Sequence, residues 1–244
     1  MLYYNHEGKL VEYNPLERKS TIVGGCSNLY VFNNYIFKKY YTFVLGENRV
    51  KIDVFNALNA IDNRHLLKIY ELLIEKEKYE NNCDESKDIY ENFLNMDVDA
   101  YTMPILIKDN TSVLDRKVEF ILEMLSEMEE LIKTISEGKI LLQDIKPSNV
   151  LIEENNMILI DWDKYKLVPY ELGTILNMNE WQILGLFASI FIEACNTYKE
   201  KEQMINLFDS ISSREEVLKE KSLAMQLRER LNGYKSVREY MNGR

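Results

Sequence analysis

Cysteine, proline and glycine are all scarce in this chain. Its 244 residues include three cysteines (Cys26, Cys83 and Cys195), four prolines and nine glycines. Three cysteines far apart in the sequence give neither a disulfide framework nor the close spacing of a metal site, so we expect a reducing compartment. The low glycine and proline content excludes a collagen-like or low-complexity chain, and 16 tyrosines with nine phenylalanines provide apolar volume for a folded core.

Positive charge and long apolar runs are also in short supply. Thirty basic residues against 40 acidic ones give a net charge of -10, which disfavours binding to nucleic acid. The first residues lack a basic segment followed by an apolar run, and the longest apolar stretch, residues 183–192, is too short to span a bilayer. We therefore expect a cytoplasmic protein without nucleic-acid or membrane partners, although the sequence leaves open export as an effector without a signal peptide.

The first third of the sequence favours an antiparallel sheet. Turn residues at positions 7–8 and 33–34 each separate two runs of strand-forming residues. If Asn33 and Asn34 form a two-residue hairpin loop, Val31 lies opposite Ile36 and Leu29 lies opposite Lys38. These four side chains then share one face of the sheet, which places a lysine on an apolar surface. The strands predicted here are residues 2–4, 10–13, 27–32 and 35–41.

Helical periodicity dominates after a connector near Pro104. Earlier, one helix is expected within residues 50–61, and the charged stretch 75–92 is expected to be an exposed insertion with a short helix after Ser86. The remaining predicted elements are strands 66–74, 102–107, 150–152 and 157–160, helices 118–135 and 181–194, and two C-terminal helices that begin at the capping boxes Ser212/Glu215 and Ser236/Glu239.

Residues 141–163, LLQDIKPSNVLIEENNMILIDWD, carry the strongest indication of function. The sequence places Asp144, Lys146 and Asn149 on a loop before one strand of a hairpin, and Asp161 at the end of the other strand. An amide oxygen and a carboxylate brought together in this way suit Mg²⁺. Asp144 is then available to orient or deprotonate a hydroxyl, and Lys146 to neutralise charge on a transferred phosphoryl group.

This stretch resembles the catalytic loop and the metal loop of the protein kinase superfamily. LQDIKPSNVLI stands where that family has its His-Arg-Asp loop, and DWD stands where it has Asp-Phe-Gly; a lysine two residues after the aspartate resembles the serine/threonine-specific branch. The resemblance implies that Asp144 is the catalytic base, that Lys146 contacts the γ-phosphate, and that Asn149 and Asp161 bind Mg²⁺.

Weaker matches lie upstream. Lys38 resembles the lysine of the third strand that anchors ATP, with Lys39 as a competitor, and VGGCSNLYV resembles a degenerate phosphate-covering loop. Residues 103–106 fall where the family has the hinge that binds adenine. The nucleotide contacts implied by the resemblance are Lys38, Gly24, Gly25, Val31, Ile36, Met103, Ile105, Asn149 and Asp161.

The sequence also departs from the family. The helix glutamate that pairs with the strand lysine aligns near Val54, and the nearest acid, Asp53, would have to rotate by about 100 degrees around the helix to serve. Gln143 replaces the arginine that receives an activation-loop phosphate. Asp163 replaces the glycine of Asp-Phe-Gly and is expected to stiffen the loop.

The segment after Asp161 is short. Glu180 stands where the family has the acid that opens its central helix, and only 18 residues separate it from Asp161. We therefore expect no counterpart of the activation segment and its platform for peptide substrates, and no control by activation-loop phosphorylation.

Together these observations predict an α+β, two-lobed protein-kinase-like fold: an N-terminal ATP-binding lobe (residues 1–103) with an antiparallel sheet and one helix, and a mainly helical catalytic lobe (residues 104–244). The predicted activity is transfer of the γ-phosphoryl group of ATP, with Mg²⁺, to a serine or threonine of a protein substrate, with a possible activating protein partner. Two alternatives remain open: a pseudokinase that binds nucleotide without transfer, and a small-molecule kinase of the aminoglycoside- or choline-kinase-like type.

Overall fold

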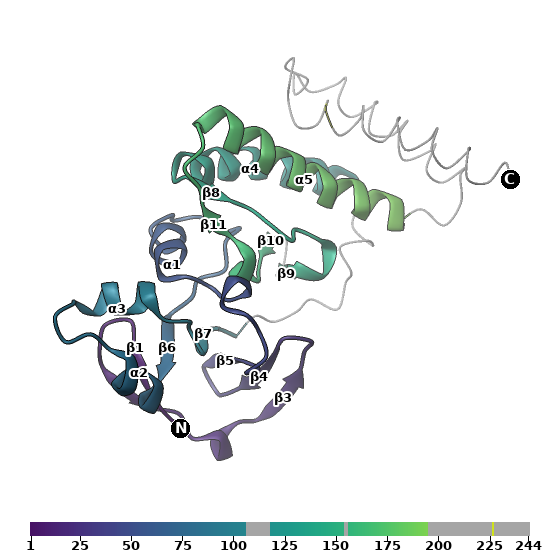
Figure 1. Cartoon of the computed structure of the whole chain (residues 1–244). Coiled ribbons are helices and arrows are strands. Elements are labelled where there is room, and N and C mark those ends of the chain that lie inside the picture. Colours follow the sequence, from purple (N-terminus) through teal and green to yellow (C-terminus); the bar gives the residue numbers. More distant parts are fainter. Residues whose placement is uncertain (106–117, 154–155, 195–225, 227–244) are drawn as a thin grey trace, which may run out of the picture. The chain divides into compact units, whose positions relative to one another are not determined.

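A seven-stranded antiparallel sheet organises the N-terminal part of the chain (Figure 1). The computed structural model describes residues 1–105, 118–153, 156–194 and 226. The strands lie in the order β2-β1-β6-β7-β5-β4-β3. Their bounds are β1 (Leu2–Asn5), β2 (Leu10–Glu12), β3 (Ser20–Val23), β4 (Ser27–Val31), β5 (Tyr35–Tyr40), β6 (Glu71–Glu75) and β7 (Ala100–Pro104).

The predicted register of the β4–β5 hairpin is confirmed. Val31 lies opposite Ile36 and Leu29 lies opposite Lys38. The backbone N–H of Phe32 donates to the carbonyl of Tyr35 at 2.9 Å, so positions 33 and 34 form the two-residue loop. Alternation along β5 therefore separates two sets of side chains, with positions 36, 38 and 40 on one face and positions 35, 37 and 39 on the other.

The face that carries Phe37 holds the aromatic core of the sheet. The Phe37 ring centroid lies 5.5 Å from that of Tyr3 and 4.6 Å from that of Tyr13. Tyr3 comes from β1 and Tyr13 follows β2, so the N-terminal hairpin is fixed by burial of its own aromatic side chains. Leu73 and Ala100, both fully buried, complete the cluster from β6 and β7.

The part of the chain that the structure describes contains five helices, and none of them is long and apolar enough to cross a membrane. Short 3₁₀ turns occur at Pro15–Glu17, Gly46–Asn48, Pro147–Asn149 and Trp162–Lys164. The helices are α1 (Ile52–Asn59), α2 (Lys76–Asn82), α3 (Ile89–Asn95), α4 (Val118–Glu137) and α5 (Leu172–Ala194).

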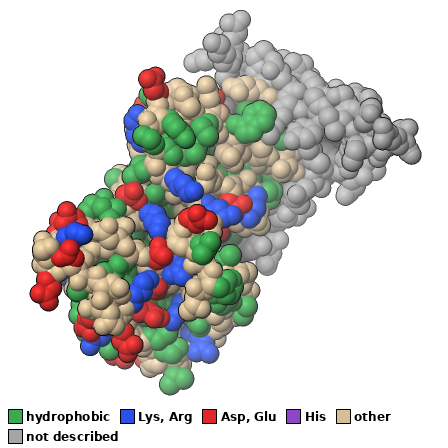
Figure 2. Space-filling model, viewed as in Figure 1, with side chains coloured by type: hydrophobic (Ala, Val, Ile, Leu, Met, Phe, Trp, Pro, Cys, Tyr) green, Lys and Arg blue, Asp and Glu red, His purple; other side chains and the backbone are tan. Residues whose placement is uncertain are grey.

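The chain divides into two compact units. The first comprises Met1–Ile107 together with Asp161–Val168, and the second comprises Lys108–Ile160 and Pro169–Arg244. The first unit thus takes in a late segment of the sequence, including the short strand β11 (Lys166–Leu167). On the face of the first unit visible in Figure 2, acidic and basic side chains are interspersed.

In the second unit, α4 packs against α5, and a short strand, β8 (Ile140–Leu141), contacts both helices. The antiparallel hairpin of β9 (Val150–Glu153) and β10 (Asn156–Leu159) follows. The buried residues of α4 recur every three or four positions, which is the pattern of an amphipathic helix with one face in the core. They are Met124, Leu125, Met128, Leu131, Ile132 and Ile135.

Three predicted elements need correction. The strand expected at 66–74 begins only at Glu71, although the preceding Leu66, Leu67 and Ile69 are buried. The stretch 75–92 includes the unexpected helix α2, whereas the short helix predicted after Ser86 is confirmed as α3, which is capped by Asp88 and Glu91 in reciprocal hydrogen bonds.

The third correction concerns the central helix. It begins at Leu172 rather than Trp181, and Trp181 is 63% exposed. Apart from residue 226, the two predicted C-terminal helices lie outside the described residues.

Candidate functional site

Lys38 lies near the middle of the sheet with its ammonium enclosed by acidic and aromatic side chains of the first unit. Only 7% of the residue is exposed. Its Nζ donates to Oδ1 of Asp161 at 2.6 Å and to Oδ2 of Asp163 at 2.7 Å. The ammonium also lies 5.2 Å from the ring centroid of Tyr101 and 5.4 Å from that of Tyr40, within the range of cation–π contacts.

The neighbouring lysine has a different environment. Lys39 points to the opposite face of β5, where its Nζ lies 2.8 Å from Oε1 of Glu75 in a solvent-exposed ion pair. The two lysines are therefore distinguished by strand alternation, and Lys38 is the one that meets Asp161.

Asp161 and Asp163 differ in exposure. The Asp161 side chain is 34% exposed, whereas that of Asp163 is 11% exposed. Asp163 is held further by the hydroxyl of Tyr40, which donates to its Oδ1 at 2.5 Å and itself accepts the backbone N–H of Val50. Because Tyr40 lies two residues after Lys38 on β5, one strand face supplies two donors to the same carboxylate.

One ammonium between two carboxylates leaves this cluster with excess negative charge. Burial raises the pKa of the Asp163 carboxyl to about 6, and the charge of Asp161 adds to that rise while Lys38 opposes it. For Lys38, burial alone would lower the pKa. The adjacent tyrosine and the two carboxylates outweigh burial, so the pKa of the lysine is held well above its usual value.

The predicted phosphate loop is the turn between β3 and β4. The N–H of Gly24 donates to the carbonyl of Ser27 at 2.9 Å, and the hydroxyl of Tyr41 donates to the carbonyl of Gly24. Gly25 is exposed, and a Cβ there would meet nothing within 4 Å. The structure therefore places both glycines in an open hairpin turn.

The predicted adenine contacts share the face of Lys38. Val31 is partly exposed on β4, Ile36 is buried on β5, and Met103 lies opposite Ile36 on β7. Ile105 follows the end of β7 and is partly buried. The residues around Lys38 thus form an apolar strip that runs across three adjacent strands.

The second unit holds the other predicted residues on the loop between β8 and β9. Nζ of Lys146 lies 3.0 and 2.9 Å from the two carboxylate oxygens of Asp144. Nδ2 of Asn149 donates to the backbone carbonyl of Asp144 at 2.9 Å, and the N–H of Ile160 donates to the carbonyl of Asn149 at 3.0 Å. The hairpin therefore brings Asn149 beside Ile160, the residue that precedes Asp161.

A buried amide anchors the start of this loop. Asn179 on α5 accepts the N–H of Leu142 at 2.8 Å through Oδ1, and its Nδ2 donates to the carbonyl of Ile140 at 2.9 Å and to Oγ of Ser136 at 3.0 Å. Asn179 is fully buried, whereas Glu180 is only partly buried. The prediction that Glu180 opens the central helix is wrong, because α5 begins eight residues earlier, at Leu172, and Asn179 is the residue that faces the loop.

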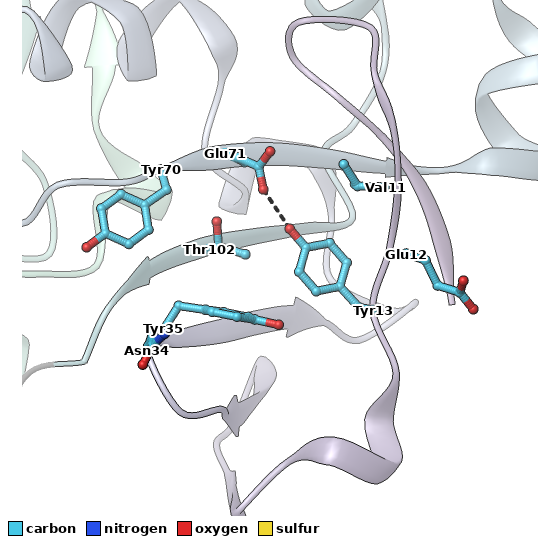
Figure 3. A pocket seen from close by; sticks show the side chains of 8 residues that line it. All are labelled: Val11, Glu12, Tyr13, Asn34, Tyr35, Tyr70, Glu71 and Thr102. Atoms are coloured by element: carbon cyan, nitrogen blue, oxygen red, sulfur yellow. Dashed lines mark hydrogen bonds between the residues drawn. The ribbon is translucent and has the colours of Figure 1, made fainter.

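A surface pocket of the first unit lies away from these residues (Figure 3). It has a volume of about 490 Å³, and Figure 3 shows the Tyr13 hydroxyl directed at the Glu71 carboxylate, a hydrogen bond of 2.6 Å. Tyr35 and Thr102 line it from the sheet face opposite to Lys38. The pocket is therefore separate from the candidate site.

Comparison with protein-family models gave no match to this chain, and comparison with curated protein sequences gave no significant match. The functional interpretation consequently depends on the residues and their geometry alone.

Three residues of the site were not predicted as such. Tyr40 could have been found from alternation, because it lies two positions after Lys38. Asn179 could have been found from helical spacing, because Ile175 and Ile183, four residues on either side, are also fully buried. Asp163 was predicted only to stiffen its loop, and nothing in its local sequence indicates a contact with β5.

Proposed function

We propose that the protein is a minimal serine/threonine-protein kinase that transfers the γ-phosphoryl group of ATP, with Mg²⁺, to a protein substrate. The proposal includes a two-lobed protein-kinase-like fold, a cytoplasmic site of action and an activity that is either constitutive or set by a protein partner. It requires Lys38, Asp161, Asn149, Asp144 and Lys146 to act on one nucleotide and one acceptor hydroxyl.

The observation that carries the proposal is the 2.6 Å contact between Lys38 and Asp161, which are 123 residues apart in the sequence. The two residues were selected from separate motifs, one by strand register and the other by its place after the hairpin. In phosphoryl transfer by protein kinases, a lysine on the third strand and an aspartate of the metal loop act on the same triphosphate. Lys38 is on β5, the third strand of the run β3-β4-β5.

The backbone at the two key aspartates supports a functional role. Asp144 has φ of 58 degrees and Asp161 has φ of 67 degrees, both in the left-handed region. A side chain in that region costs on the order of 1–3 kcal/mol, and such residues cluster at active sites. Of the three non-glycine residues with positive φ in the described part of the chain, two are these aspartates.

The donor set suits Mg²⁺ bound to a nucleotide. Mg²⁺ is usually held by one or two protein oxygens together with phosphate oxygens and water, and Asp161 and Asn149 would supply the protein oxygens. The ion would neutralise charge on the phosphates. Nδ2 of Asn149 is engaged by the carbonyl of Asp144, which turns the amide oxygen away from that carbonyl.

The remaining residues have roles that follow from their chemistry. Lys38 would hold the phosphates, and its raised pKa keeps it charged at neutral pH. Asp144 would accept the proton of the acceptor hydroxyl, and Lys146, which already contacts it, would stabilise charge on the transferred group. Catalysis of this kind consists mainly of positioning and charge stabilisation.

A specific observation favours each of two alternatives. The turn between β3 and β4 has Cys26 where the family's second glycine would allow close approach to phosphates, which favours a nucleotide-binding module without transfer. Only residues 162–171 separate Asp161 from α5, which leaves little chain for a peptide platform and favours a small alcohol or aminosugar as acceptor.

The test is transfer of labelled phosphate from ATP by the purified protein, to itself and to generic basic proteins. We expect Asp144→Asn, Lys38→Met and Asp161→Ala each to lower transfer by at least about 100-fold, because each removes a group that acts on the transferred phosphoryl. Lys39→Met is the matched control, since the adjacent lysine lies on the other face of β5, and it should retain transfer.

The outcomes separate the candidates. Equal transfer by wild type and Asp144→Asn would indicate a contaminating kinase and contradict the proposal. Mg-ATP binding without transfer would favour the binding module. Transfer to small alcohols or aminosugars, and not to proteins, would favour the small-molecule kinase.

A further inference from the structure

The strand lysine of a protein kinase needs a carboxylate to hold it, and helix α1 does not provide an obvious one. The acid of α1 is Asp53, whose Oδ1 accepts the backbone N–H of Val54 at the start of the helix. The partners of the Lys38 ammonium are instead Asp161 and Asp163, both from the segment that follows the β9–β10 hairpin.

We infer that Asp163 is the positioning residue for Lys38, taking the place of a helix acid, and that Asp161 is the acid that serves the metal and the nucleotide. This inference rests on the proposed function. It assigns different roles to the two acids of the Asp-Trp-Asp motif: Asp163 holds Lys38, and Asp161 serves the metal and the nucleotide.

The side chains of Asp161 and Asp163 differ in solvent exposure, which supports the two different roles. Asp161, with a side chain 34% exposed, can be reached by a ligand, whereas Asp163, at 11%, is enclosed. Asp163 also has fixed partners on both oxygens, since Lys38 donates to Oδ2 and the Tyr40 hydroxyl donates to Oδ1. A carboxylate that is buried and doubly bonded in this way can hold an ammonium in one orientation without being drawn to a ligand.

The packing around Asp163 fixes its position. Trp162 is fully buried, and the N–H of Tyr165 donates to the Trp162 carbonyl at 3.0 Å to close a single 3₁₀ turn. Tyr165 is also buried, so the turn that carries Asp163 is held by an aromatic side chain on each side. Trp162 stands where the family has phenylalanine, and its burial therefore helps to fix the position of Asp163, the next residue.

A regulatory consequence follows. Lys38, Tyr40 and Asp163 all belong to the first unit, and the two hydrogen bonds that Asp163 accepts from Lys38 and Tyr40 come from β5 and not from α1. The lysine–acid pair consequently forms without any movement of a helix. A kinase built in this way has no helix-gated switch, which agrees with the absence of a basic residue at Gln143 to receive an activating phosphate.

The test compares steady-state phosphoryl transfer by wild type, Asp163→Asn and the control Asp53→Asn. We expect Asp163→Asn to lower kcat/KM for ATP by about ten- to a hundredfold, because small errors in placing a charged group have effects of this size. Asp53→Asn should remain within about twofold of wild type, because the Lys38 ammonium donates to Asp161 and Asp163 and the amide that replaces the Asp53 carboxylate can still accept the Val54 N–H. Tyr40→Phe, which removes the hydrogen bond to Asp163 together with the one accepted from the Val50 N–H, should give a smaller loss in the same direction.

A double-mutant cycle distinguishes positioning from a general structural effect. If Asp163 acts through Lys38, the variant Lys38→Met with Asp163→Asn should be no less active than Lys38→Met alone. Additive losses would show that Asp163 acts elsewhere and would overturn the inference. If Asp163→Asn does not fold, the same cycle between Tyr40→Phe and Lys38→Met decides the question.

The remaining outcomes are also decisive. Wild-type transfer with full activity in Asp163→Asn would overturn the inference and leave the proposed function standing. A loss in Asp53→Asn as large as in Asp163→Asn would assign the role to the helix. If the wild type neither transfers phosphate nor binds Mg-ATP, the proposed function fails and the inference fails with it.

Discussion

His6 is a half-buried polar side chain of the first unit, outside the candidate site, that has hydrogen-bond and ring partners. Its Nδ1 accepts the backbone N–H of Leu72 at 3.3 Å, and its ring meets that of Phe55 at 4.6 Å between centroids. Burial lowers the pKa of His6 below its usual value of 6.5, and the nearby carboxylates of Glu7 and Glu71 oppose this effect without reversing it. The folded state therefore prefers the neutral ring, which alone can accept the hydrogen bond.

This preference predicts a pH dependence of stability. Because the folded-state pKa of His6 is depressed, its contribution is fully present above pH 6.5 and is lost as the pH falls through the folded-state pKa. His6→Asn keeps an acceptor near the Leu72 N–H but does not titrate in this range. Urea denaturation at pH 7, 6 and 5 should show a steeper fall in the free energy of unfolding for wild type than for the variant. Parallel pH profiles would contradict the prediction.

At the same scale, the sequence predicted some site residues and missed others for a physical reason. Strand alternation and a two-residue loop were sufficient to put Lys38 on the apolar face, because both depend only on neighbours in the sequence. The contact with Asp163 depends on a chain segment 125 residues away. No local pattern encodes such a contact, and the family motif has glycine at that position, so its role could not be anticipated.

Helix α5 packs in the second unit and also holds a neighbouring loop through Asn179. Asn179 closes three hydrogen bonds to β8, the following loop and α4, all through one fully buried amide. The loop that bears Asp144 therefore starts from a fixed point on a helix.

Removing the Asn179 side-chain amide should lower the free energy of unfolding. Asn179→Ala leaves the N–H of Leu142 and the carbonyl of Ile140 buried without this partner, and each such group costs about 1–3 kcal/mol. We expect the free energy of unfolding to fall by about 3 kcal/mol in chemical denaturation. Asn177→Ala, an exposed asparagine two residues earlier on α5, is the matched control and should change it by less than about 0.5 kcal/mol. Similar values for the two variants would show that the three hydrogen bonds contribute little.

Elements were predicted best where turn chemistry or a long amphipathic pattern defined them. The β4–β5 and β9–β10 hairpins and α4 were predicted to within a few residues, since each has clear end signals. Helix α2 was missed because its charged and amide side chains give no apolar period, and its position depends on contacts with β1 and β6. The start of α5 was placed too late because residues 172–180 are mixed in polarity, although Ile175 and Asn179 lie on the buried face.

Each of the two compact units of the molecule is formed from two separate segments of the sequence. Asp161–Val168 follows the hairpin of the second unit but packs with the sheet of the first. The N–H of Ile160, the residue before this segment, donates to the carbonyl of Asn149 within the second unit. The α+β composition and the antiparallel sheet followed from the sequence, whereas this assignment of a late segment did not, because it depends on long-range packing.

If the proposed function holds, nucleotide should stabilise the folded protein in a manner that depends on both Mg²⁺ and Lys38. A ligand at 100 times its Kd adds about 2.7 kcal/mol to the folded state, which for a chain of this size corresponds to a rise in Tm of about 5–10 °C. Calorimetry with a non-hydrolysable ATP analogue should show this rise with Mg²⁺ and a much smaller one when the metal is chelated. Lys38→Met should lose the rise, whereas Lys39→Met should keep it, since the two lysines differ in the face of β5 that they occupy and not in charge. An equal rise in both variants would show that the nucleotide binds away from Lys38, and the lysine cluster would then be a purely structural ion pair.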